Sequence, residues 1–405
     1  MAADTAERRN LPLDGITVID LGQIYQGPYA TLLMAKAGAK VIKVEPPHGE
    51  PARWRSKVGR GATLPMVMLN SNKRGIVLNL KTEKGRELLA GLASKADVLL
   101  ENFAPGVMEK LGIGWSRLSE LNPRLVYASG TGYGLTGPER DSLAMDVTVQ
   151  AASGFMSVTG FPDRPPVKAG PAVIDFLSGV HLYGAIVTAL YERTITGRGR
   201  LVEVAMQEAA YASLASSLGM IYESKGDVPL RVGNRHSGLS VAPYNVYKAK
   251  DGWVAIICAV EGHWLAILEA MGRMDLAEDP RFSSNPARVA HIDETDALVE
   301  SWTSTLTRAE FKALAKRHRI PSSPVRDVKE VMLDPHMHER GMLEWIDHPD
   351  LGRIVVPTSP LRFHGAETVA TTPSPQLGQH TAEVLEEMLS IGPDAFAQLK
   401  EEGAV

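Results

Sequence analysis

The sequence lacks most features that mark secreted, membrane, metal-binding or nucleic-acid-binding proteins. Cys258 is its single cysteine, which excludes an internal disulfide and a cysteine-based metal cluster and fits a reducing cytoplasm. A net charge of -4 leaves no basic excess for a nucleic acid. The first ten residues have no apolar core of a signal peptide, and apolar runs such as residues 180–191 are too short to span a bilayer. We therefore expect a soluble, cytoplasmic protein without a nucleic-acid or membrane partner.

Two kinds of catalytic motif are also missing. The 11 histidines contain neither an H-x-x-x-H nor an H-E-x-x-H pattern, and no third ligand accompanies His336 and His338. We therefore expect no metal site. Ser178 does not lie in a G-x-S-x-G elbow, which argues against a serine hydrolase.

One glycine pattern matches the dinucleotide-binding motif in sequence but lacks the structural context that the motif requires. Gly132, Gly134 and Gly137 follow a predicted strand and match G-x-G-x-x-G. Pro138 and a charged run stand where the fingerprint needs a helix to begin, and no acidic residue about 20 positions further on is placed to hold a ribose. A nicotinamide dehydrogenase is therefore disfavoured. We expect a flexible loop whose glycines let the backbone approach a ligand closely.

The order of predicted elements is that of an α/β protein. At 405 residues the chain is long enough for two domains. Residues 16–21, 29–37 and 41–44 are predicted as strand, helix and strand, which favours a parallel sheet. Further strands are predicted at residues 75–80, 97–100, 125–129 and 201–205, and a further helix at 84–95. Together they predict a large doubly wound, Rossmann-like domain.

The pattern changes after about residue 225. A hairpin is predicted from residues 242–248 and 253–259, followed by helices at 263–271, 295–305 and 308–317. We therefore predict a large α/β domain in residues 1–227 and a smaller α+β domain in residues 228–335. The C-terminal segment, residues 336–405, contains a predicted helix at 381–389 and is expected to return to the large domain.

Asp175 is a lone acid among apolar neighbours at the start of a predicted helix, beside Ser178 and Gly179. As an N-cap it would only begin the helix, and this segment alone favours that use. A carboxylate here is also suited to attack a carbonyl centre, because the N–H groups of the helix start stabilise negative charge.

Amides and cations gather where one strand is predicted to begin and to end. Asn70, Asn72, Lys73 and Arg74 precede this strand, and residues 79–81 close it. Such groups suit a phosphate-rich or adenine-bearing ligand at a sheet edge. A solvated basic turn would have the same composition, and the residues alone leave both interpretations open.

Taken together, these segments resemble the class III coenzyme A transferases, the family of formyl-CoA transferase, carnitine CoA-transferase and α-methylacyl-CoA racemase. The likeness covers nearly the whole chain. It rests on residues 13–20, 38–45, 70–74, 101–106, 132–138, 175–179, 197–199 and 377–381.

The resemblance implies an interlocked homodimer that moves CoA from an acyl-CoA to a small carboxylic acid, with no permanently bound cofactor. Asp175 matches the family's nucleophile, which forms an acyl-aspartyl anhydride and then an aspartyl-CoA thioester. The same resemblance implies a set of contacts to the CoA ester. They are Tyr25, Gln26, Asn72, Lys73, Arg74, Leu78, Asn79, Lys81, Asn102, Phe103, Gly132, Tyr133 and Asp146.

The chain departs from the family pattern at two of its functional positions. Where the racemase branch has a His-Asp pair, this chain has Met145 and Asp146. Methionine carries no proton, so the departure favours transfer over a 2-methylacyl-CoA racemase. Pro46 replaces a CoA-contacting arginine, so that contact is lost or moved to Arg53 or Arg55.

A third departure concerns the substrate. Residues 233–244 replace the mobile glycine-rich loop of formyl-CoA transferase, which argues against oxalate and formate. The segment is more like that of members acting on succinate, glutarate, itaconate, mesaconate or citramalate. Arg235 and His236 would then bind the remote carboxylate of a dicarboxylic acid, although a polar loop near any substrate entrance would have similar residues. A CoA-binding protein without turnover is the alternative of another class, and the presence of Asp175 counts against it.

Overall fold

The computed structural model describes residues 11–55 and 62–405, which form two compact units. The first unit comprises Met1–Val149, Pro171–Ala210 and Met332–Val405. The second unit comprises Gln150–Gly170 and Tyr211–Val331. The predicted domain limits at residues 227 and 335 do not coincide with these units and stay a prediction.

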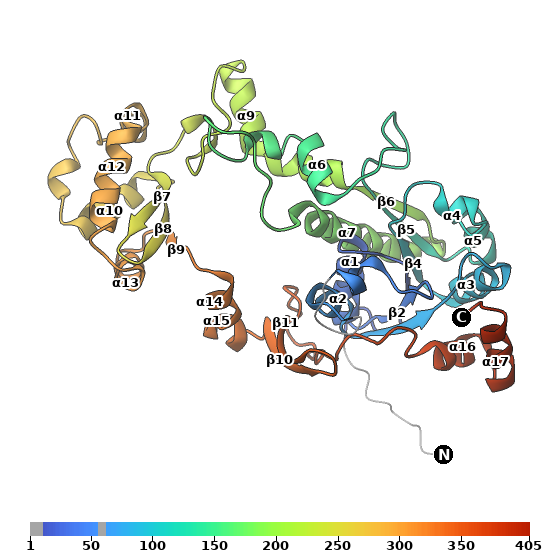
Figure 1. Cartoon of the computed structure of the whole chain (residues 1–405). Helices are drawn as coiled ribbons and strands as arrows, with labels where there is room; N and C mark the ends of the chain where they lie inside the picture. Colours follow the sequence, from blue (N-terminus) through green and yellow to red (C-terminus); the bar gives the residue numbers. More distant parts are fainter. Residues whose placement is uncertain (1–10, 56–61) are drawn as a thin grey trace. The chain divides into compact units, whose positions relative to one another are not determined.

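A six-stranded sheet, parallel throughout, forms the centre of the first unit (Figure 1). Its strand order is β3-β2-β1-β4-β5-β6, so the order reverses between the neighbouring strands β1 and β4. The predicted α/β fold with a parallel sheet is therefore confirmed. The strands are β1 Thr17–Asp20, β2 Lys40–Glu45, β3 Lys73–Val77, β4 Val98–Glu101, β5 Val126–Thr131 and β6 Leu201–Ala205.

Helices cover both faces of this sheet, because successive side chains of each strand point to opposite faces. Val18 and Leu100 belong to a core shared with α1 and α7, whereas Ile19 and Leu99 belong to a core shared with α3, α5 and α16. The helices of this unit are α1 Gln26–Lys36, α2 Leu64–Asn70, α3 Glu83–Lys95, α4 Val107–Lys110, α5 Trp115–Leu121, α7 Val173–Thr196, α15 Pro335–Glu339, α16 Thr381–Leu389 and α17 Pro393–Glu401.

A local cap begins α3, and a long-range hydrogen bond at its other end connects it to the C-terminal helix α16. Thr82 Oγ1 accepts a hydrogen bond from the Gly85 N–H (3.0 Å), which caps the helix start. At the other end, Lys95 Nζ donates to the carbonyl oxygen of Met388 in α16 (2.6 Å). The helices α3 and α16 therefore pack together on one face of the sheet (Figure 1).

The second unit has an antiparallel sheet of its own, in the order β7-β8-β9. Trp264 and Phe311, both almost fully buried, lie in its core. Its elements are α9 Ala215–Ser224, β7 Tyr244–Ala249, β8 Gly252–Ile257, α10 Glu261–Met271, α11 Asn285–Ala290, α12 Ile292–Thr303, α13 Arg308–His318 and β9 Ser322–Pro324. Three helices cross the limits between the units: α6 Asp146–Ala152, α8 Met206–Tyr211 and α14 Val328–Met332.

The sequence analysis did not predict a hairpin in the first unit, β10 Leu343–His348 and β11 Gly352–Pro357. Charged and polar residues interrupt its strands, so the apolar alternation is short. Ile346 and Val356 nevertheless pack with Val67 of α2 in a small core. A contact with a distant helix thus decides a structure that the local pattern leaves open.

Helix α7 corrects the expectation about apolar segments. The run at residues 180–191 belongs to a helix of 24 residues whose most apolar window has a mean hydropathy of 1.6. By length and composition it is sufficient to cross a membrane, and within the described part of the chain it is the one helix that meets this test. The core helix of a soluble protein meets the same test, and Leu182 and Ile186 of α7 are buried against α1 and the sheet.

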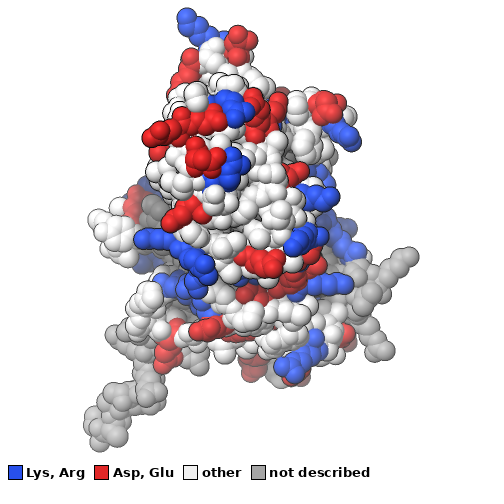
Figure 2. All heavy atoms as spheres, turned by 90° about the vertical axis from the view of Figure 1, so that its left-hand side faces the viewer, with Lys and Arg blue, Asp and Glu red and all other residues white. Residues whose placement is uncertain are grey.

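Charges of both signs are mixed on the face of the molecule that Figure 2 draws. Lysine and arginine side chains alternate there with aspartate and glutamate, and the described residues form no broad patch of one sign on that face.

Candidate active site

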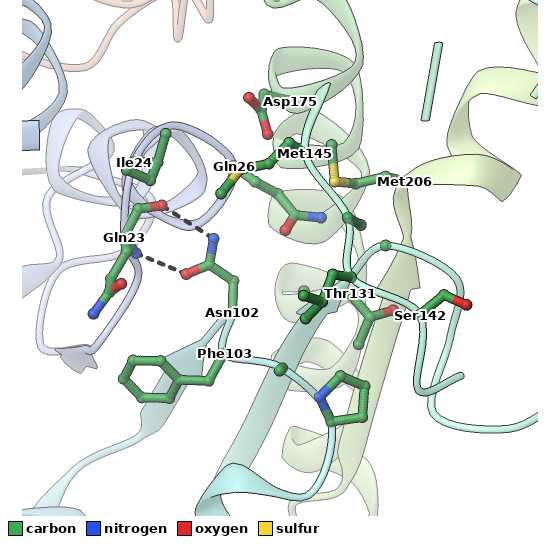
Figure 3. Close-up of a pocket in the computed structure, with 16 residues that line it drawn as sticks. Gln23, Ile24, Gln26, Asn102, Phe103, Thr131, Ser142, Met145, Asp175 and Met206 are labelled. Atoms are coloured by element: carbon green, nitrogen blue, oxygen red, sulfur yellow. Dashed lines mark hydrogen bonds between the residues drawn. The ribbon is translucent and has the colours of Figure 1, made fainter. Parts of the chain in front are cut away.

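Two cavities lie along the carboxyl edge of the parallel sheet, where its strand order reverses. The Asp175 cavity has a volume of about 280 Å³ and is lined by Gln26, Asn102, Gly130, Met145, Asp175 and Met206, among others (Figure 3). The Leu78 cavity has a volume of about 550 Å³ and is lined by residues that follow β1 to β4. Gln23 and Phe103 line both cavities. This edge is where open α/β sheets bind ligands.

Asp175 is the third residue of α7, half-buried and facing the first of these cavities. Burial, and secondly the Asp146 carboxylate, raise the pKa of Asp175 to about 7, while the Arg55 guanidinium opposes this rise. Among the described residues, none donates a hydrogen bond to the Asp175 carboxylate. The group is thus available to react with a ligand.

Asp146, and not Asp175, caps α7. Its Oδ2 accepts hydrogen bonds from the N–H groups of Ile174 (2.8 Å) and Asp175 (3.2 Å). The capping role considered for Asp175 is therefore wrong, because another carboxylate, distant in sequence, occupies the helix start. The predicted CoA contact of Asp146 stays a prediction.

Asn102 holds the loop that follows β1. Its Oδ1 accepts from the Gln23 N–H (2.7 Å) and its Nδ2 donates to the Gln23 carbonyl oxygen (3.0 Å), as Figure 3 shows. Glu50 Oε2 accepts from the next N–H, that of Ile24 (2.9 Å). These bonds keep Ile24 in the left-handed region, at φ 64, which a β-branched residue rarely adopts. The amide of Asn102 is thus used to shape the cavity wall.

Three buried ion pairs lie beneath this loop: Asp20–Lys73 at 2.9 Å, Lys43–Glu50 at 3.4 Å and Glu45–Arg53 at 2.7 Å. Although burial alone would raise the pKa of Asp20, Lys73 and Lys43 hold it below its usual value. Lys73 was predicted to contact CoA. The strand β3 begins at Lys73, two residues earlier than predicted, and the Lys73 side chain is buried beside Asp20.

The neighbours of Lys73 also bond within the protein. Asn72 Nδ2 donates to the Ala370 carbonyl oxygen (2.7 Å). Arg74 pairs with Glu383 and Glu387 of α16, at 3.0 and 2.6 Å. These bonds attach the C-terminal segment to β3. The predicted CoA contacts of Asn72, Lys73 and Arg74 are untested. Lys73 Nζ is fully engaged within the fold, whereas Asn72 Oδ1 and Arg74 Nε bond to no described residue.

Four of the residues predicted to contact CoA line the larger, Leu78 cavity: Leu78, Asn79, Lys81 and Phe103. Leu78 is almost fully buried, whereas the Lys81 side chain is exposed. An apolar floor with a cation at its rim suits an adenine ring bearing phosphates.

Of the remaining predicted contacts, Gln26, Asn102 and Gly132 line the smaller cavity. Tyr25 does not line it and stacks on Phe176 with ring centroids 5.9 Å apart. The Arg55 guanidinium lies 5.9 Å from the centre of the Tyr25 ring. Arg53 is bound to Glu45, so Arg55 is the better candidate for the contact missing at Pro46. Tyr133 follows Gly132 in the same loop and does not line either cavity.

The glycine-patterned loop leads into no helix. After β5 the chain forms turns and bends, and α6 begins only at Asp146. The helix N-terminus that a dinucleotide fingerprint requires is therefore missing directly after this loop. Within the described residues, no group of three or more histidine, cysteine or acidic side chains is arranged to hold a metal ion.

Arg235 and His236 belong to the second unit. Arg235 pairs with Asp293 and Asp296 at 2.5 and 2.7 Å. His236 Nδ1 lies 2.7 Å from Ser240 Oγ. The charge of Arg235 is thus balanced within its own unit, and the predicted substrate contacts of both residues stay predictions.

Several cavity residues escaped the sequence analysis. Gln23 and Ile24 follow β1, and Met206 follows β6 directly. All three stand at carboxyl ends of parallel strands, so the rule that places ligands at this edge is the signal that would have found them. Glu50, which holds Ile24, has no comparable signal, because its role depends on a contact 26 positions away.

Comparisons with known proteins agree with this geometry. A model of CoA-transferase family III matches residues 13–381. A formyl-CoA:oxalate CoA-transferase from Streptomyces coelicolor is 36% identical over 97% of this chain and 99% of its own length. A succinyl-CoA–D-citramalate CoA-transferase from Chloroflexus aurantiacus is 34% identical over 98% of both chains. The solved structure of a CAIB/BAIF family protein from Brucella suis has a TM-score of 0.82 and 35% identity, covering 94% of this chain and 100% of its own.

Proposed function

The chain belongs to CoA-transferase family III, and from this premise we propose that it transfers CoA from an acyl-CoA to a small carboxylic acid through covalent intermediates on Asp175. The observation that carries the proposal is the Asp175 carboxylate itself. It faces a cavity at the strand-order reversal of the sheet, without a hydrogen-bond donor among the described residues. Its pKa of about 7 leaves a large share ionised and nucleophilic at neutral pH.

The reaction begins with two exchanges on Asp175. A carboxylate oxygen of Asp175 attacks the thioester carbon, the C–S bond breaks, and CoA leaves as the thiolate. The thiolate then attacks the Asp175 carbonyl carbon of the mixed anhydride. The C–O bond breaks, the donor acid leaves as a carboxylate, and Asp175 is left as its CoA thioester. Each acyl bond is exchanged for another activated one, so the energy of the thioester is kept.

The second half reverses these steps with the acceptor acid. Its carboxylate attacks the aspartyl-CoA thioester and displaces the thiolate, which gives a second anhydride. The thiolate attacks the acceptor's acyl carbon, forming the product thioester and returning the Asp175 carboxylate. Water would hydrolyse either intermediate, so the cavity must exclude it during turnover.

The two cavities support one orientation of the CoA ester. The thioester would lie in the smaller cavity next to Asp175, and the adenine end in the larger one, over Leu78. Gln23 and Phe103 line both and would flank the connecting arm. Lys81, exposed at the larger cavity, is placed to meet a phosphate group.

For the substrates we propose succinyl-CoA as donor and a small dicarboxylic acid as acceptor. Besides the citramalate enzyme, a succinate–glutarate CoA-transferase from Agrobacterium fabrum is 34% identical over 95% of this chain and 97% of its own length. A relative named for oxalate is slightly more similar, at 36% identity against 34%, so identity alone does not favour these acids. Replacing Arg235 with alanine tests whether this residue binds the remote carboxylate of the acceptor. An unchanged apparent affinity for the acceptor would contradict the predicted contact.

A racemase is not supported. Met145 lines the smaller cavity at the place where the resemblance gives the racemase branch a histidine. A thioether neither donates nor accepts the proton that racemisation moves.

We also propose a cytoplasmic homodimer, as the resemblance implies. Tyr191 and Ile195, on the outer side of α7, are 69% and 72% exposed, which is unusual for large apolar residues so close together and suits burial by a second copy. Light scattering during gel filtration tests the dimer, and a mass of 43.8 kDa for the eluting species would contradict it.

An oxygen-exchange experiment tests the covalent route. With an acceptor acid labelled with oxygen-18 in its carboxylate, each turnover leaves one labelled oxygen on Asp175, and one of the two oxygens of that carboxylate leaves with the next donor acid, so both become labelled over successive turnovers. We therefore expect one labelled oxygen in each succinate released at steady state, and none with Asp175→Ala. Unlabelled succinate formed during active transfer would contradict the anhydride route.

A further inference from the structure

Lys36 is a buried cation without a counter-ion among the described residues. It ends α1 and is only 8% exposed. Its Nζ donates to Thr371 Oγ1 (2.5 Å), and no described carboxylate forms an ion pair with it. The other buried lysines that the structure describes, Lys43 and Lys73, each have a carboxylate partner. A lysine is rarely buried unless its charge is balanced, so we expect an anion from outside this part of the chain to reach Lys36.

One glutamate compensates the charge of Lys36 only in part. Burial lowers the pKa of Lys36 to about 8, although the Glu344 carboxylate acts to raise it. Glu344 Oε2 accepts a hydrogen bond from the Thr371 N–H (3.2 Å) and thus holds the backbone beside the amine. A group with a pKa of about 8 is still mostly protonated at pH 7. Lys36 therefore carries its positive charge at neutral pH although it is buried.

A cavity of about 280 Å³ lies beside this residue, and we name it the Lys36 cavity. Leu11 and residues between Thr358 and Val369, in the stretch that follows β11, supply the rest of its lining. It shares no lining residue with the Asp175 cavity. The first residue of α1 lines the Asp175 cavity and the last lines the Lys36 cavity, and a rise of 1.5 Å per residue separates these ends by about 15 Å. The Lys36 cavity is therefore a separate site.

Further donors line this cavity. Arg362 and His364 do so, and within the described residues neither forms a hydrogen bond or an ion pair. Ser359, 7% exposed, accepts at Oγ from the Leu361 N–H (3.1 Å), which leaves its hydroxyl proton to donate. Glu367 is the one acid among the lining residues. Ammonium, guanidinium and hydroxyl groups together suit the oxygen atoms of a carboxylate or a phosphate.

We propose that the Lys36 cavity binds a small oxyanion, inorganic phosphate or a short carboxylate, through Lys36, Ser359 and Arg362. This inference goes beyond the proposed function, since the cavity contains none of the groups assigned to CoA transfer. Its volume is below the usual range of cavities that bind drug-sized ligands, so a whole CoA ester does not fit. The oxyanion supplies the counter-charge that Lys36 lacks.

A bound oxyanion would connect α1 to the C-terminal segment that covers the edge strand β3. Residues 358–369 lead into this segment, where the Thr372 carbonyl oxygen accepts from the Asn72 N–H (3.3 Å). Pro375 packs on β3, because a Cβ atom at Gly75 would lie 2.8 Å from the Pro375 ring. Binding should therefore slow amide hydrogen exchange in residues 358–369. Exchange that is unchanged in saturating phosphate or succinate would contradict binding at this cavity.

Lys36→Met tests the site, because it removes the ammonium group and keeps an unbranched side chain. We expect calorimetric titration with phosphate, at constant ionic strength, to give an affinity at least about tenfold lower for this variant than for the wild type. Arg362→Ala should lower the affinity only about two- to fivefold, because Arg362 is exposed. Lys40→Met is the matched control, since Lys40 is exposed at the start of β2 and lines a different cavity.

Thermal unfolding and a second titration extend this test. At ten times its dissociation constant, phosphate should raise the ratio of folded to unfolded wild type about tenfold and leave that of Lys36→Met unchanged. Succinate is titrated in the same way. Because succinate is also a proposed substrate, only the part of its binding that Lys36→Met loses supports this site. Loss of binding for one anion and not the other identifies the oxyanion.

Equal affinities of the wild type and Lys36→Met, for phosphate and for succinate, would overturn the inference. Absence of binding of both anions by the wild type at this cavity would overturn it as well. If Lys36→Met unfolds, Arg362→Ala decides, because this substitution changes an exposed side chain. An affinity unchanged by Arg362→Ala would then contradict the site.

Discussion

Two groups of polar side chains lie at the carboxyl edge of one sheet, and they differ in whether their members are paired. In the group beneath the loop after β1, each charge has a partner, as Asp20 has Lys73. In the group around the Asp175 cavity, the Asp175 carboxylate and the Gln26 nitrogen lack hydrogen-bond partners among the described residues. Paired groups stabilise the fold, whereas unpaired ones are available to a ligand. Pairing, and not residue type, therefore separates structural acids from the proposed nucleophile.

The largest effect is expected from the unpaired acid. In Asp175→Asn the side chain keeps its shape and loses its nucleophilic oxygen, so the transfer rate should fall by at least about 10⁴-fold. The melting temperature should stay close to that of the wild type, because no described residue donates a hydrogen bond to this carboxylate. Asp175→Ala is measured in parallel, because deamidation of the asparagine variant would restore aspartate and with it the activity, whereas alanine cannot be converted in this way. A rate above one hundredth of the wild type would exclude the nucleophilic role.

Breaking the buried pair Asp20–Lys73 should instead lower the stability of the fold. Lys73→Met removes the cation that is completely buried beside Asp20, and breaking such a pair costs about 3–5 kcal/mol. We expect this loss in the free energy of unfolding measured with urea. Lys84→Met, in the exposed pair Lys84–Glu87, is the control and should change stability little. Equal stability of both variants would mean that the buried pairs do not hold the loop.

The pH dependence of adduct formation reports the ionisation of Asp175. Because the pKa of Asp175 is raised to about 7, the reactive carboxylate is lost as the pH falls through 7. The rate of adduct formation should thus drop about tenfold per pH unit below this value. Arg55→Ala should move the midpoint upward, since the Arg55 charge lowers this pKa. A rate constant independent of pH between 5 and 7 would contradict the raised pKa.

The smallest effect is expected at the rim of the larger cavity. Lys81 is exposed, so Lys81→Ala should raise the KM for succinyl-CoA only about two- to fivefold, and less at high salt. The loss should disappear with a CoA ester that lacks its 3′-phosphate. Lys84→Ala, on the neighbouring helix α3, is the matched control. An equal loss with the dephosphorylated ester would remove Lys81 from phosphate binding.

The sequence was sufficient for the elements of the parallel sheet, because strands buried on both faces are nearly continuous apolar runs. The hairpin β10–β11 was missed, since its polar residues break that pattern and distant contacts decide its structure. Strand limits also mattered. The start of β3 was predicted two residues too late, so Lys73 and Arg74 were expected before the strand, whereas both belong to it.

For the site, the sequence led to Asp175, Asp146 and Asn102 as candidates, but not to the contacts that these residues make within the protein. Asp146 caps α7 from about 28 positions away, and Asn102 holds Gln23 across 79 positions. The space for the Gln26 amide depends on Gly130, in another strand. Local patterns specify helices and strands, whereas these pairings exist only once the sheet brings the segments together.

The most direct measurement is the intact mass of the protein after mixing with succinyl-CoA. A covalent CoA thioester on Asp175 predicts a mass gain of one CoA less one water, removable by hydroxylamine and absent from Asp175→Ala. No adduct with succinyl-, acetyl- or formyl-CoA, under conditions in which the wild type transfers CoA, would contradict covalent catalysis by Asp175.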